Sequence, residues 1–293
     1  MQTKVMVLGS GGMAGHIITL KLREQTDLFQ LTEVAHRDNV LKPGILLDVT
    51  DEEALRNALL EHKPDVIVNC IGILNQAAED RPDKAILINS YLPHFLEQFT
   101  RDSKTRVIHI STDCVFSGNR EGGRYTEVDF KDGKGFYAQT KALGEIINNK
   151  DLTIRTSIIG PELNATGIGL FNWFAKQQGR INGYTRAYWT GVTTIELANA
   201  IARSIELGLT GLYHLVNDVK ISKFALLELF LSTFSKSKVV EIAPYENYVV
   251  DKSLVNTRAD YRLEVPSYGG MVEGMKKWVE THPELYPHYG HLQ

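Results

Sequence analysis

The first half of the chain alternates short apolar, β-branched runs with helical stretches, and this alternation limits the fold more than any other feature. Parallel strands need crossover connections, which are usually helices, and these helices cover both faces of the sheet. The pattern therefore predicts an α/β fold built on a doubly wound parallel sheet. The runs expected to form its strands are residues 4–8, 31–35, 66–69, 107–110 and 153–158.

A glycine-rich turn follows the first predicted strand and opens a helical segment. Gly9 permits a tight turn, Gly12 lets the backbone approach a pyrophosphate at the positive end of the helix, and Gly15 allows the helix to pack close to the strand. Met13 is the first residue of that helical segment after Gly12. In this context the turn predicts a Rossmann-like dinucleotide site rather than a plain turn.

The end of the second predicted strand bears on the choice of dinucleotide. Sites that prefer NAD usually carry an acidic residue here, about twenty residues after the glycines, to hold the ribose 2′-hydroxyl. This chain has Ala35, His36 and Arg37 instead. A guanidinium favours a 2′-phosphate, so we expect NADPH, with a solvated loop arginine as the alternative explanation.

From residue 161 onward the pattern loosens, which indicates a smaller, discontinuous substrate-binding lobe. A run at 211–216 is expected to return to the sheet as one more strand. Helices are expected near 171–174, 195–205 and 224–234. The domain limits that follow are a dinucleotide-binding domain of residues 1–160 with a returning segment near 185–218, and a substrate lobe of residues 161–184 and 219–293.

The overall composition excludes several classes of protein. With 43% hydrophobic residues the chain can bury a sizeable core, while a net charge of −3 gives no general attraction to nucleic acid or an anionic membrane. The apolar run near the amino terminus is too short for a signal peptide or a membrane span. Cys70 and Cys114 are the only cysteines, which suits a reducing compartment. We expect a cytoplasmic protein without nucleic-acid or membrane partners.

A threonine ends the fourth predicted strand, and a Tyr–Lys pair follows on a predicted helix. Thr112 is expected at the carboxyl edge of the sheet, where ligands bind in such folds, and Tyr137 and Lys141 fall one helical turn apart. A phenol titrates near 10, so acid–base work at neutral pH needs a nearby cation, and we expect Lys141 to lower the pKa of Tyr137. Thr112 would hydrogen-bond a carbonyl, Tyr137 would donate the proton as hydride arrives from the nicotinamide, and Lys141 would also hold the nicotinamide ribose.

Together these features resemble the extended short-chain dehydrogenases/reductases, and among them the dTDP-4-dehydrorhamnose reductases. The likeness implies that the chain reduces the 4-keto group of a nucleotide-linked 6-deoxyhexose with NADPH, or with NADH as the alternative, on the way to surface polysaccharide. Thr112, Tyr137 and Lys141 match the family's catalytic triad. The likeness rests on the glycine turn and on residues 47–51, 63–69, 111–118, 137–145 and 155–157.

The resemblance also assigns binding residues. Asp48 would contact the adenine, residues 69–72 would line the cofactor cleft, and Asn89 would support a proton relay through the catalytic helix. The expected substrate contacts after the strand are Thr112, Asp113, Cys114 and Val115. The expected cofactor contacts are Gly9, Gly12, Met13, Gly15, Arg37, Asp48, Val49, Asn69, Cys70, Gly72, Asn89, Tyr137 and Lys141.

Three further substrate contacts are expected in the second half. Arg186 and Trp189 lie in a segment that is expected to be an exposed loop, where an aromatic residue and an arginine suit a charged nucleotide sugar. Asn172 lies among aromatic residues that either stack on a base or pack a core. No metal is expected, because the histidines near the end match no defined site and predict a surface tail; these are His282, His288 and His291.

Several alternatives stay open at this point. Cys114 stands where the family usually has tyrosine, so the sugar pocket can differ, and a UDP-linked N-acetylated 4-keto-6-deoxysugar is the competing substrate. A nucleotide-sugar epimerase or dehydratase is a second functional class, for which Asp113 is the only carboxylate next to the threonine. A non-catalytic nucleotide-binding regulatory subunit is a third, although the complete triad argues against it. The oligomeric state is open, with a homodimer as the expected form.

Overall fold

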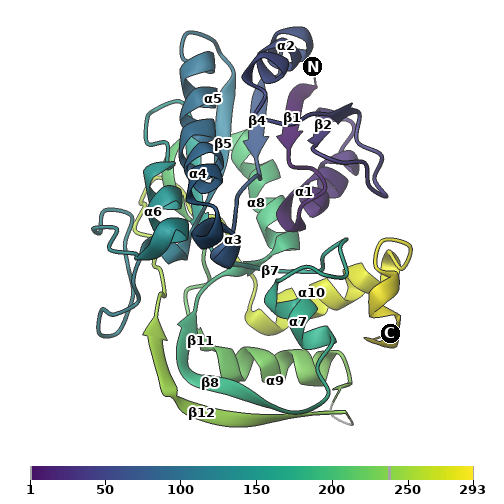
Figure 1. The fold of residues 1–293 in the computed structure, drawn as a ribbon, viewed down its shortest axis with the longest axis vertical. Helices are drawn as coiled ribbons and strands as arrows, with labels where there is room; N and C mark the ends of the chain where they lie inside the picture. The colour runs from purple at the N-terminus through teal and green to yellow at the C-terminus, as the bar shows by residue number, and fades with distance from the viewer. Residues whose placement is uncertain (1, 237–238, 293) are drawn as a thin grey trace. The chain divides into compact units, whose positions relative to one another are not determined.

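The computed structural model describes residues 2–236 and 239–292, and its largest element is a seven-stranded sheet (Figure 1). The strand order is β10-β6-β5-β4-β1-β2-β3, and the pairs β1–β2, β1–β4, β2–β3 and β4–β5 are parallel. This confirms the doubly wound α/β fold. The strands are β1 (Thr3–Leu8), β2 (Phe29–Ala35), β3 (Ile45–Leu46), β4 (Val66–Asn69), β5 (Arg106–Thr112), β6 (Leu152–Thr156) and β10 (Gly211–His214).

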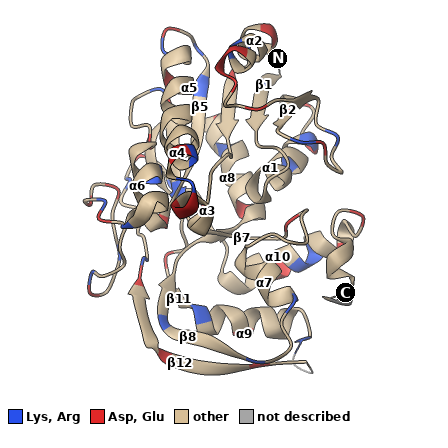
Figure 2. Cartoon of the chain, in the orientation of Figure 1, with Lys and Arg blue, Asp and Glu red and all other residues tan. Residues whose placement is uncertain are grey.

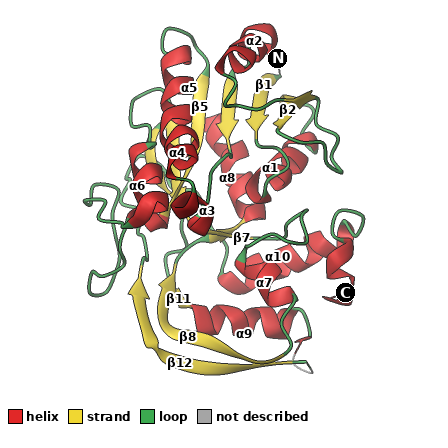
Figure 3. Cartoon of the chain, viewed as in Figure 1, coloured by secondary structure: helices red, strands yellow, loops and turns green. Residues whose placement is uncertain are grey.

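The central strands are apolar because both of their faces are covered. Val5 to Leu8 on β1 and Val66 to Val68 on β4 are at most 3% exposed. Helices with apolar faces supply the cover, and charged residues lie mainly on helices and loops (Figures 2 and 3). The helical segments between and after these strands are α1 (Met13–Arg23), α2 (Glu52–His62), α3 (Asn75–Asp80), α4 (Pro82–Ala85), the π-helix η1 (Ile86–Tyr91), α5 (Leu92–Thr100), the short 3₁₀ turn η2 (Asp113–Val115), α6 (Gly135–Leu143) and α8 (Thr194–Leu207).

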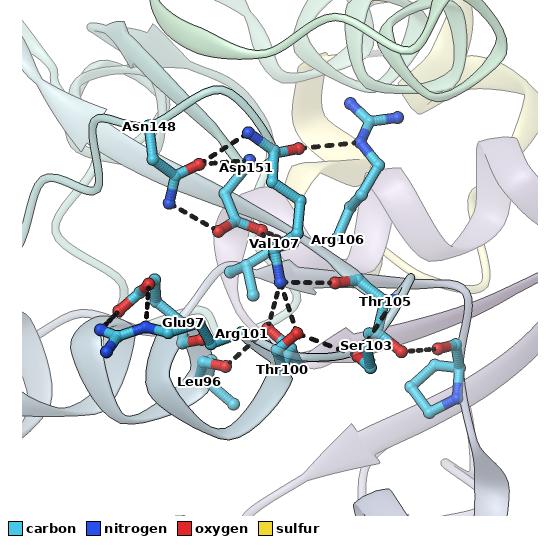
Figure 4. Close-up of polar contacts among 12 residues, drawn as sticks. Leu96, Glu97, Thr100, Arg101, Ser103, Thr105, Arg106, Val107, Asn148 and Asp151 are labelled. Atoms are coloured by element: carbon cyan, nitrogen blue, oxygen red, sulfur yellow. Dashed lines mark hydrogen bonds and ion pairs between the residues drawn. The ribbon is translucent and has the colours of Figure 1, made fainter.

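A polar cluster ties the amino ends of β5 and β6 to the end of α5 (Figure 4). Asp151, which is fully buried, accepts hydrogen bonds from Val107 N at 2.7 Å and Asn148 Nδ2 at 2.8 Å. Lys150 Nζ donates to the Thr100 carbonyl at 2.5 Å, and so satisfies a carbonyl that the helix leaves free at its C-terminus. These contacts fix the edge of the sheet opposite to the carboxyl ends of the strands.

The chain divides into two compact units. The first holds residues 1–116, 130–155 and 198–213, and the second holds residues 117–129, 156–197 and 214–293. The second unit is therefore discontinuous, and it includes the segment 117–129 from within the first half of the chain. The functional domain limits expected from the sequence stay a prediction.

The second unit has its own three-stranded sheet, in the order β11-β8-β12, and α9 packs against β8. A pair of short strands, β7 and β9, is parallel. The elements are β7 (Ile158–Ile159), α7 (Leu170–Ala175), β8 (Gly179–Trp189), β9 (Val192–Thr193), β11 (Ile221–Ser222), α9 (Lys223–Thr233), β12 (Val240–Asp251), α10 (Tyr268–Thr281) and the 3₁₀ segment η4 (Pro287–Leu292).

The prediction of a surface tail at the end of the chain is wrong. Tyr286 and Tyr289 are at most 1% exposed, and the His282 ring stacks on Trp278 with ring centroids 4.0 Å apart. Tyr289 Oη donates to Asn172 Oδ1 at 3.0 Å, which ties η4 to α7. The prolines suggested a loop, but the aromatic residues between them bury enough apolar surface to dock the segment.

Candidate active site

The glycine turn after β1 has the geometry expected of it. Gly9 has φ +83°, and a Cβ at Gly15 would lie 2.0 Å from the Gly9 carbonyl oxygen, so helix and strand approach as closely as backbone allows. A Cβ at Gly12 would meet only that same oxygen, at 3.4 Å. The turn therefore leaves space in front of Gly12, where α1 begins at Met13. This cradle suits a pyrophosphate, and the cofactor contacts of these residues stay a prediction.

The loop after β2 carries the residues expected to select the cofactor. Arg37 is exposed, and Asp48 accepts hydrogen bonds from the Thr50 hydroxyl at 2.7 Å and the Thr50 N–H at 2.9 Å. These two bonds hold the pKa of Asp48 below its usual range. His36 Nδ1 lies 3.8 Å from the same carboxylate. Asp48 is thus an ionised, fixed acceptor beside Val49, as a contact with an adenine or ribose would require.

Asn89 joins the loop after β4 to the catalytic helix. It lies in the π-helix η1, a rare turn that often marks functional sites, and it is fully buried. Its amide accepts from Ile73 N at 2.8 Å and donates to the Ile73 carbonyl at 2.9 Å and to Thr140 Oγ1 at 3.1 Å. A Cβ at Gly144 would lie 1.8 Å from the Asn89 carbonyl oxygen, so α6 ends directly against η1. The side chain of Asn89 therefore positions both segments.

The same loop contains the half-buried Cys70 and Gly72. Burial raises the pKa of the Cys70 thiol to about 12, so it is neutral. A Cβ at Gly72 would meet Asn89 Oδ1 at 3.5 Å. Cys70 is thus a packing thiol at the edge of the expected cofactor cleft, and nothing marks it as a reactive group.

The structure brings the expected catalytic side chains together at the carboxyl end of β5. Thr112 is the last residue of β5, and Tyr137 and Lys141 lie one turn apart on α6. The Thr112 side chain is near enough to the Tyr137 phenol to act on its pKa. Thr112 Oγ1 also lies 3.2 Å from Asp113 Oδ1 and accepts from Cys114 N at 3.1 Å, which fixes the hydroxyl. Threonine and tyrosine hydroxyls can therefore meet on one carbonyl oxygen.

The expected lowering of the Tyr137 pKa is not found. Burial raises the pKa of Tyr137, the neighbouring Cys114 and Asp113 add to that, and only the neighbouring Thr112 side chain opposes it. Lys141 Nζ donates to the Ile110 carbonyl at 2.6 Å and lies 3.3 Å from His109 Nε2, and these contacts direct it toward β5. Tyr137 is accordingly protonated at neutral pH, the form that a proton donor needs.

Burial lowers the pKa of Lys141 to about 8, and Glu145 and Cys70 oppose this effect. The residue is 4% exposed. Its amine is consequently poised to exchange its proton close to neutral pH, which an exposed lysine does not do.

A buried ion pair anchors the carboxyl end of α6. Arg155 on β6 donates from Nε and Nη2 to the two oxygens of Glu145, at 2.8 Å and 2.7 Å. Ser111 Oγ donates to Glu145 Oε1 at 2.7 Å, and Lys131 Nζ lies 3.1 Å from Oε2. The carboxylate thus links α6 to β5 and β6. Sequence reasoning included Glu145 and Arg155 in the family segments without assigning them this role.

The amino end of α6 is capped from another helix. Among the described residues the N-cap Lys134 supplies no side-chain cap, and Glu79 on α3 accepts from Tyr137 N at 3.1 Å instead. This carboxylate at the positive end of α6 fixes the backbone of Tyr137, the expected proton donor. No sequence signal identifies Glu79, because its partner lies 58 residues away.

The substrate contacts expected in the second unit have different environments. Arg186 is exposed on β8, as expected. The exposed loop predicted around it is wrong: the segment up to Trp189 is strand, and Trp189 is 2% exposed. Asn172 is fully buried, where its Nδ2 donates to the Gly167 carbonyl at 2.7 Å and its Oδ1 accepts from Tyr289. Trp189 and Asn172 therefore have structural partners, and contact with a sugar stays a prediction for them.

The other expected substrate residues follow Thr112 directly. Asp113 is 8% exposed, Cys114 is half-buried, and Val115 is fully buried with its carbonyl accepting from Gly133 N at 2.8 Å. Cys114 is therefore the most accessible side chain of the three. Within residues 2–236 and 239–292, no group of three or more His, Cys, Asp or Glu side chains could hold a metal.

Comparison with known protein families supplies the decisive observation. The model of the RmlD substrate binding domain family matches residues 3–253. The chain belongs to this family. Its match to a dTDP-4-dehydrorhamnose reductase of Mycobacterium tuberculosis is 25% identical and covers 75% of this chain and 72% of the relative. The probable low-salt glycan biosynthesis reductase Agl14 of Haloferax volcanii is 26% identical over 72% of this chain and 74% of its own length.

Shorter matches and solved structures agree with the family. A dTDP-4-dehydrorhamnose reductase of Streptomyces griseus is 33% identical, over 48% of this chain and 43% of its own length. The crystal structure of a Bacillus anthracis dTDP-4-dehydrorhamnose reductase in complex with NADP superimposes with a TM-score of 0.80 at 21% identity, over 95% of this chain and all of that chain. A UDP-glucose 4-epimerase of Thermotoga maritima gives a TM-score of 0.77 at 16% identity, over 95% and 99%. These structures share the fold with the RmlD-family chain.

Proposed function

We propose that this RmlD-family protein is an NADPH-dependent reductase of the 4-keto group of a nucleotide-linked 6-deoxyhexose, of the dTDP-4-dehydrorhamnose reductase type. The observation that carries the proposal is the placement of Thr112, Tyr137 and Lys141 at the carboxyl end of β5, where Lys141 Nζ donates to the Ile110 carbonyl and the threonine side chain is near the phenol. Relatives named dTDP-4-dehydrorhamnose reductase support the substrate class.

In the proposed reaction, a bound NADPH supplies the hydride to the carbonyl carbon. The Thr112 hydroxyl accepts from Cys114 N, and its single proton, which Asp113 Oδ1 accepts here, would turn to the carbonyl oxygen of a bound substrate. Tyr137 gives its phenolic proton to the same oxygen as the C–O bond becomes an alcohol. Because burial keeps Tyr137 protonated, the resting site is prepared for reduction.

The remaining residues hold the site in shape. Glu79 fixes the amino end of α6 and the Arg155–Glu145 pair fixes its carboxyl end, so the spacing between Tyr137 and β5 is set from both sides. The glycine turn would hold the pyrophosphate, Asp48 the adenine or ribose, and Arg37 the 2′-phosphate. Arg186, which is charged and exposed, would contact the charged nucleotide sugar at the rim of the substrate site.

We also propose which parts of the chain bind the two ligands. Residues 1–160 with the returning segment near 185–218 would bind the dinucleotide, and residues 161–184 and 219–293 would bind the sugar nucleotide. Cys70 and Cys114 are not in a disulfide, which fits a reducing compartment, so we place the enzyme in the cytoplasm, where we expect a homodimer. No helix of the described residues is long and apolar enough to cross a membrane.

The direct test follows NADPH absorbance as substrate is added to the purified protein. Enzymatically generated dTDP-4-dehydrorhamnose is one substrate, and a UDP-linked N-acetylated 4-keto-6-deoxysugar is the other, because Cys114 changes the expected sugar pocket. Consumption with the dTDP sugar supports the proposal as stated, and consumption with the UDP sugar alone changes the substrate. Binding of NADPH without consumption of either would overturn the proposal in favour of a regulatory subunit.

A nicotinamide that co-purifies with the protein would instead favour the epimerase or dehydratase class, which retains its cofactor through turnover. An absorbance spectrum of the purified protein shows this before any substrate is made. We expect no retained nicotinamide.

A further inference from the structure

A buried hydrogen-bonded row leads away from the catalytic lysine into the sheet. Asn69 at the end of β4 and His109 on β5 are both fully buried, and Lys141 is 4% exposed. Asn69 Nδ2 lies 3.2 Å from His109 Nδ1, and His109 Nε2 lies 3.3 Å from Lys141 Nζ. Both nitrogens of the imidazole thus face a nitrogen of a neighbour. The direction of each hydrogen bond in the row depends on which nitrogen carries the ring proton.

The orientation of the Asn69 amide is set by the backbone. Ile71 N–H donates to Asn69 Oδ1 at 3.1 Å, so the oxygen of the amide faces the loop and the NH₂ group faces the histidine. The opposite orientation would put the NH₂ group against the Ile71 N–H, two donors in contact in a buried site. His109 Nδ1 must therefore accept a hydrogen bond.

The ring has one proton, which must then be on Nε2. Burial is the main cause that holds the pKa of His109 well below its usual value, and Lys141 adds to it, so the imidazole is neutral. A neutral imidazole that accepts at Nδ1 donates from Nε2. That N–H points at Lys141 Nζ. An uncharged amine can accept it, whereas an ammonium group has no lone pair and would leave two donors facing each other.

We propose that His109 is a positioning residue for Lys141: Asn69 fixes its tautomer, and the resulting Nε2–H favours the uncharged amine over the ammonium. The Ile110 carbonyl accepts from Lys141 in either state but more strongly from the ammonium, so it opposes the effect of His109. The proposal rests on the proposed function in treating Lys141 as part of the active site. Its consequence is a lysine that releases its proton more readily than an exposed lysine does.

Groups other than His109 also shift the protonation equilibrium of the Lys141 amine. Glu145, which follows the same helix, favours the ammonium, while burial opposes it. Glu145 is itself paired with Arg155 and contacted by Lys131, which weakens its effect on Lys141. His109 is the group whose hydrogen-bonding direction can be reversed by substitution without changing a charge.

The first test reads the tautomer in the protein without cofactor. Long-range ¹H–¹⁵N correlation spectra of ¹⁵N-histidine-labelled protein distinguish Nε2–H from Nδ1–H rings, and the spectrum of His109→Gln identifies the signal. We expect a neutral Nε2–H ring throughout the range from pH 6 to pH 9. An Nδ1–H ring, or a His109 that titrates near its usual pKa of 6.5, would overturn the proposal.

The second test titrates Lys141 by the ¹³Cε shift in ¹³C-lysine-labelled protein, where one lysine with a midpoint near 8 stands apart from the exposed ones. In His109→Gln the amide can turn its oxygen toward Lys141, so the midpoint should rise by about one pH unit. Ile108→Val, in the same strand but on its opposite face, is the matched control and should leave the midpoint unchanged. An unchanged midpoint in His109→Gln contradicts the proposal. Neither test uses turnover, so a failure of the proposed function would show separately.

Discussion

Two of the side-chain nitrogens of Arg155, Nε and Nη2, lie 2.8 Å and 2.7 Å from the two oxygens of Glu145, in a pair that is at most 6% exposed. The arginine belongs to β6 and the glutamate follows the catalytic helix α6, so the pair joins the helix to the sheet. The Phe116 ring lies below the guanidinium, 5.0 Å from its carbon to the ring centroid. A charge left alone in this environment would have no solvent to stabilise it.

Arg155→Ala should therefore destabilise the protein strongly. Removing one partner of a buried ion pair costs about 3–5 kcal/mol, and in this variant the buried Glu145 carboxylate would keep only the half-buried Lys131 as a charged partner. Urea unfolding followed by circular dichroism measures this loss. Arg203→Ala is the matched control, because Arg203 and Glu206 form an exposed pair on α8, and it should cost less than about 1 kcal/mol. Equal losses in the two variants would contradict the role given to the buried pair.

The geometry of the glycine turn predicts that one glycine-to-alanine substitution lowers stability, whereas another lowers the affinity for NADPH. Gly15→Ala places a Cβ 2.0 Å from the Gly9 oxygen and should reduce stability by about 2 kcal/mol or more. In Gly12→Ala the new Cβ would lie 3.4 Å from the Gly9 carbonyl oxygen, an ordinary contact distance. The same methyl group would fill the space proposed for the pyrophosphate. The variant should keep the melting temperature while weakening NADPH binding at least about tenfold, by fluorescence titration. Unchanged NADPH affinity in Gly12→Ala would count against the cofactor site.

Arg37→Ala tests the choice of cofactor. If the guanidinium binds the 2′-phosphate, the variant should lose about 1.5–3 kcal/mol of NADPH binding, roughly 10- to 100-fold in Kd, and little NADH binding. Kd values for both dinucleotides, measured on wild type and variant, give the ratio directly. Lys42→Ala, on the same loop, is the control for a general change of charge. A parallel loss for NADPH and NADH would assign Arg37 a role other than phosphate selection.

The lowered pKa of Lys141 predicts how stability depends on pH. The value is about 8 in the folded protein against 10.5 for the unperturbed group. Between these values the unfolded chain binds more protons than the folded one, so stability rises with pH from about 8 upward, by at most about 1.4 kcal/mol per unit. Lys141→Met should remove this rise, and the difference in unfolding free energy between pH 7 and pH 9.5 measures it. The same slope in both proteins would mean that Lys141 titrates normally.

The strands could be predicted because a parallel sheet with both faces covered requires continuous apolar runs, and the runs at 66–69 and 107–110 lie within observed strands. The segment before Trp189 was missed because glycine, threonine and arginine suggested a loop. Its buried residues alternate, at Ile181, Gly183, Ala187 and Trp189, which is the period of a strand.

In the candidate site, too, local sequence patterns predicted which residues come together but not their tertiary surroundings. The order of Thr112, Tyr137 and Lys141 could be predicted, since each follows from a strand end or a helical turn. The pKa of Tyr137 could not, because it depends on how deeply the phenol is buried and on where the Lys141 amine points. Glu79 and His109 contribute through tertiary contacts that no local pattern encodes.

Tyr137→Phe tests the central claim most directly. The phenol is proposed to supply the proton and nothing that NADPH binding requires, so kcat for dTDP-4-dehydrorhamnose reduction should fall at least about 100-fold while the Kd for NADPH changes less than about threefold. Stopped-flow or steady-state NADPH absorbance gives the first value and fluorescence titration the second. Turnover that survives in the variant, or a loss that appears only in NADPH affinity, would contradict the account of Tyr137 as the proton donor.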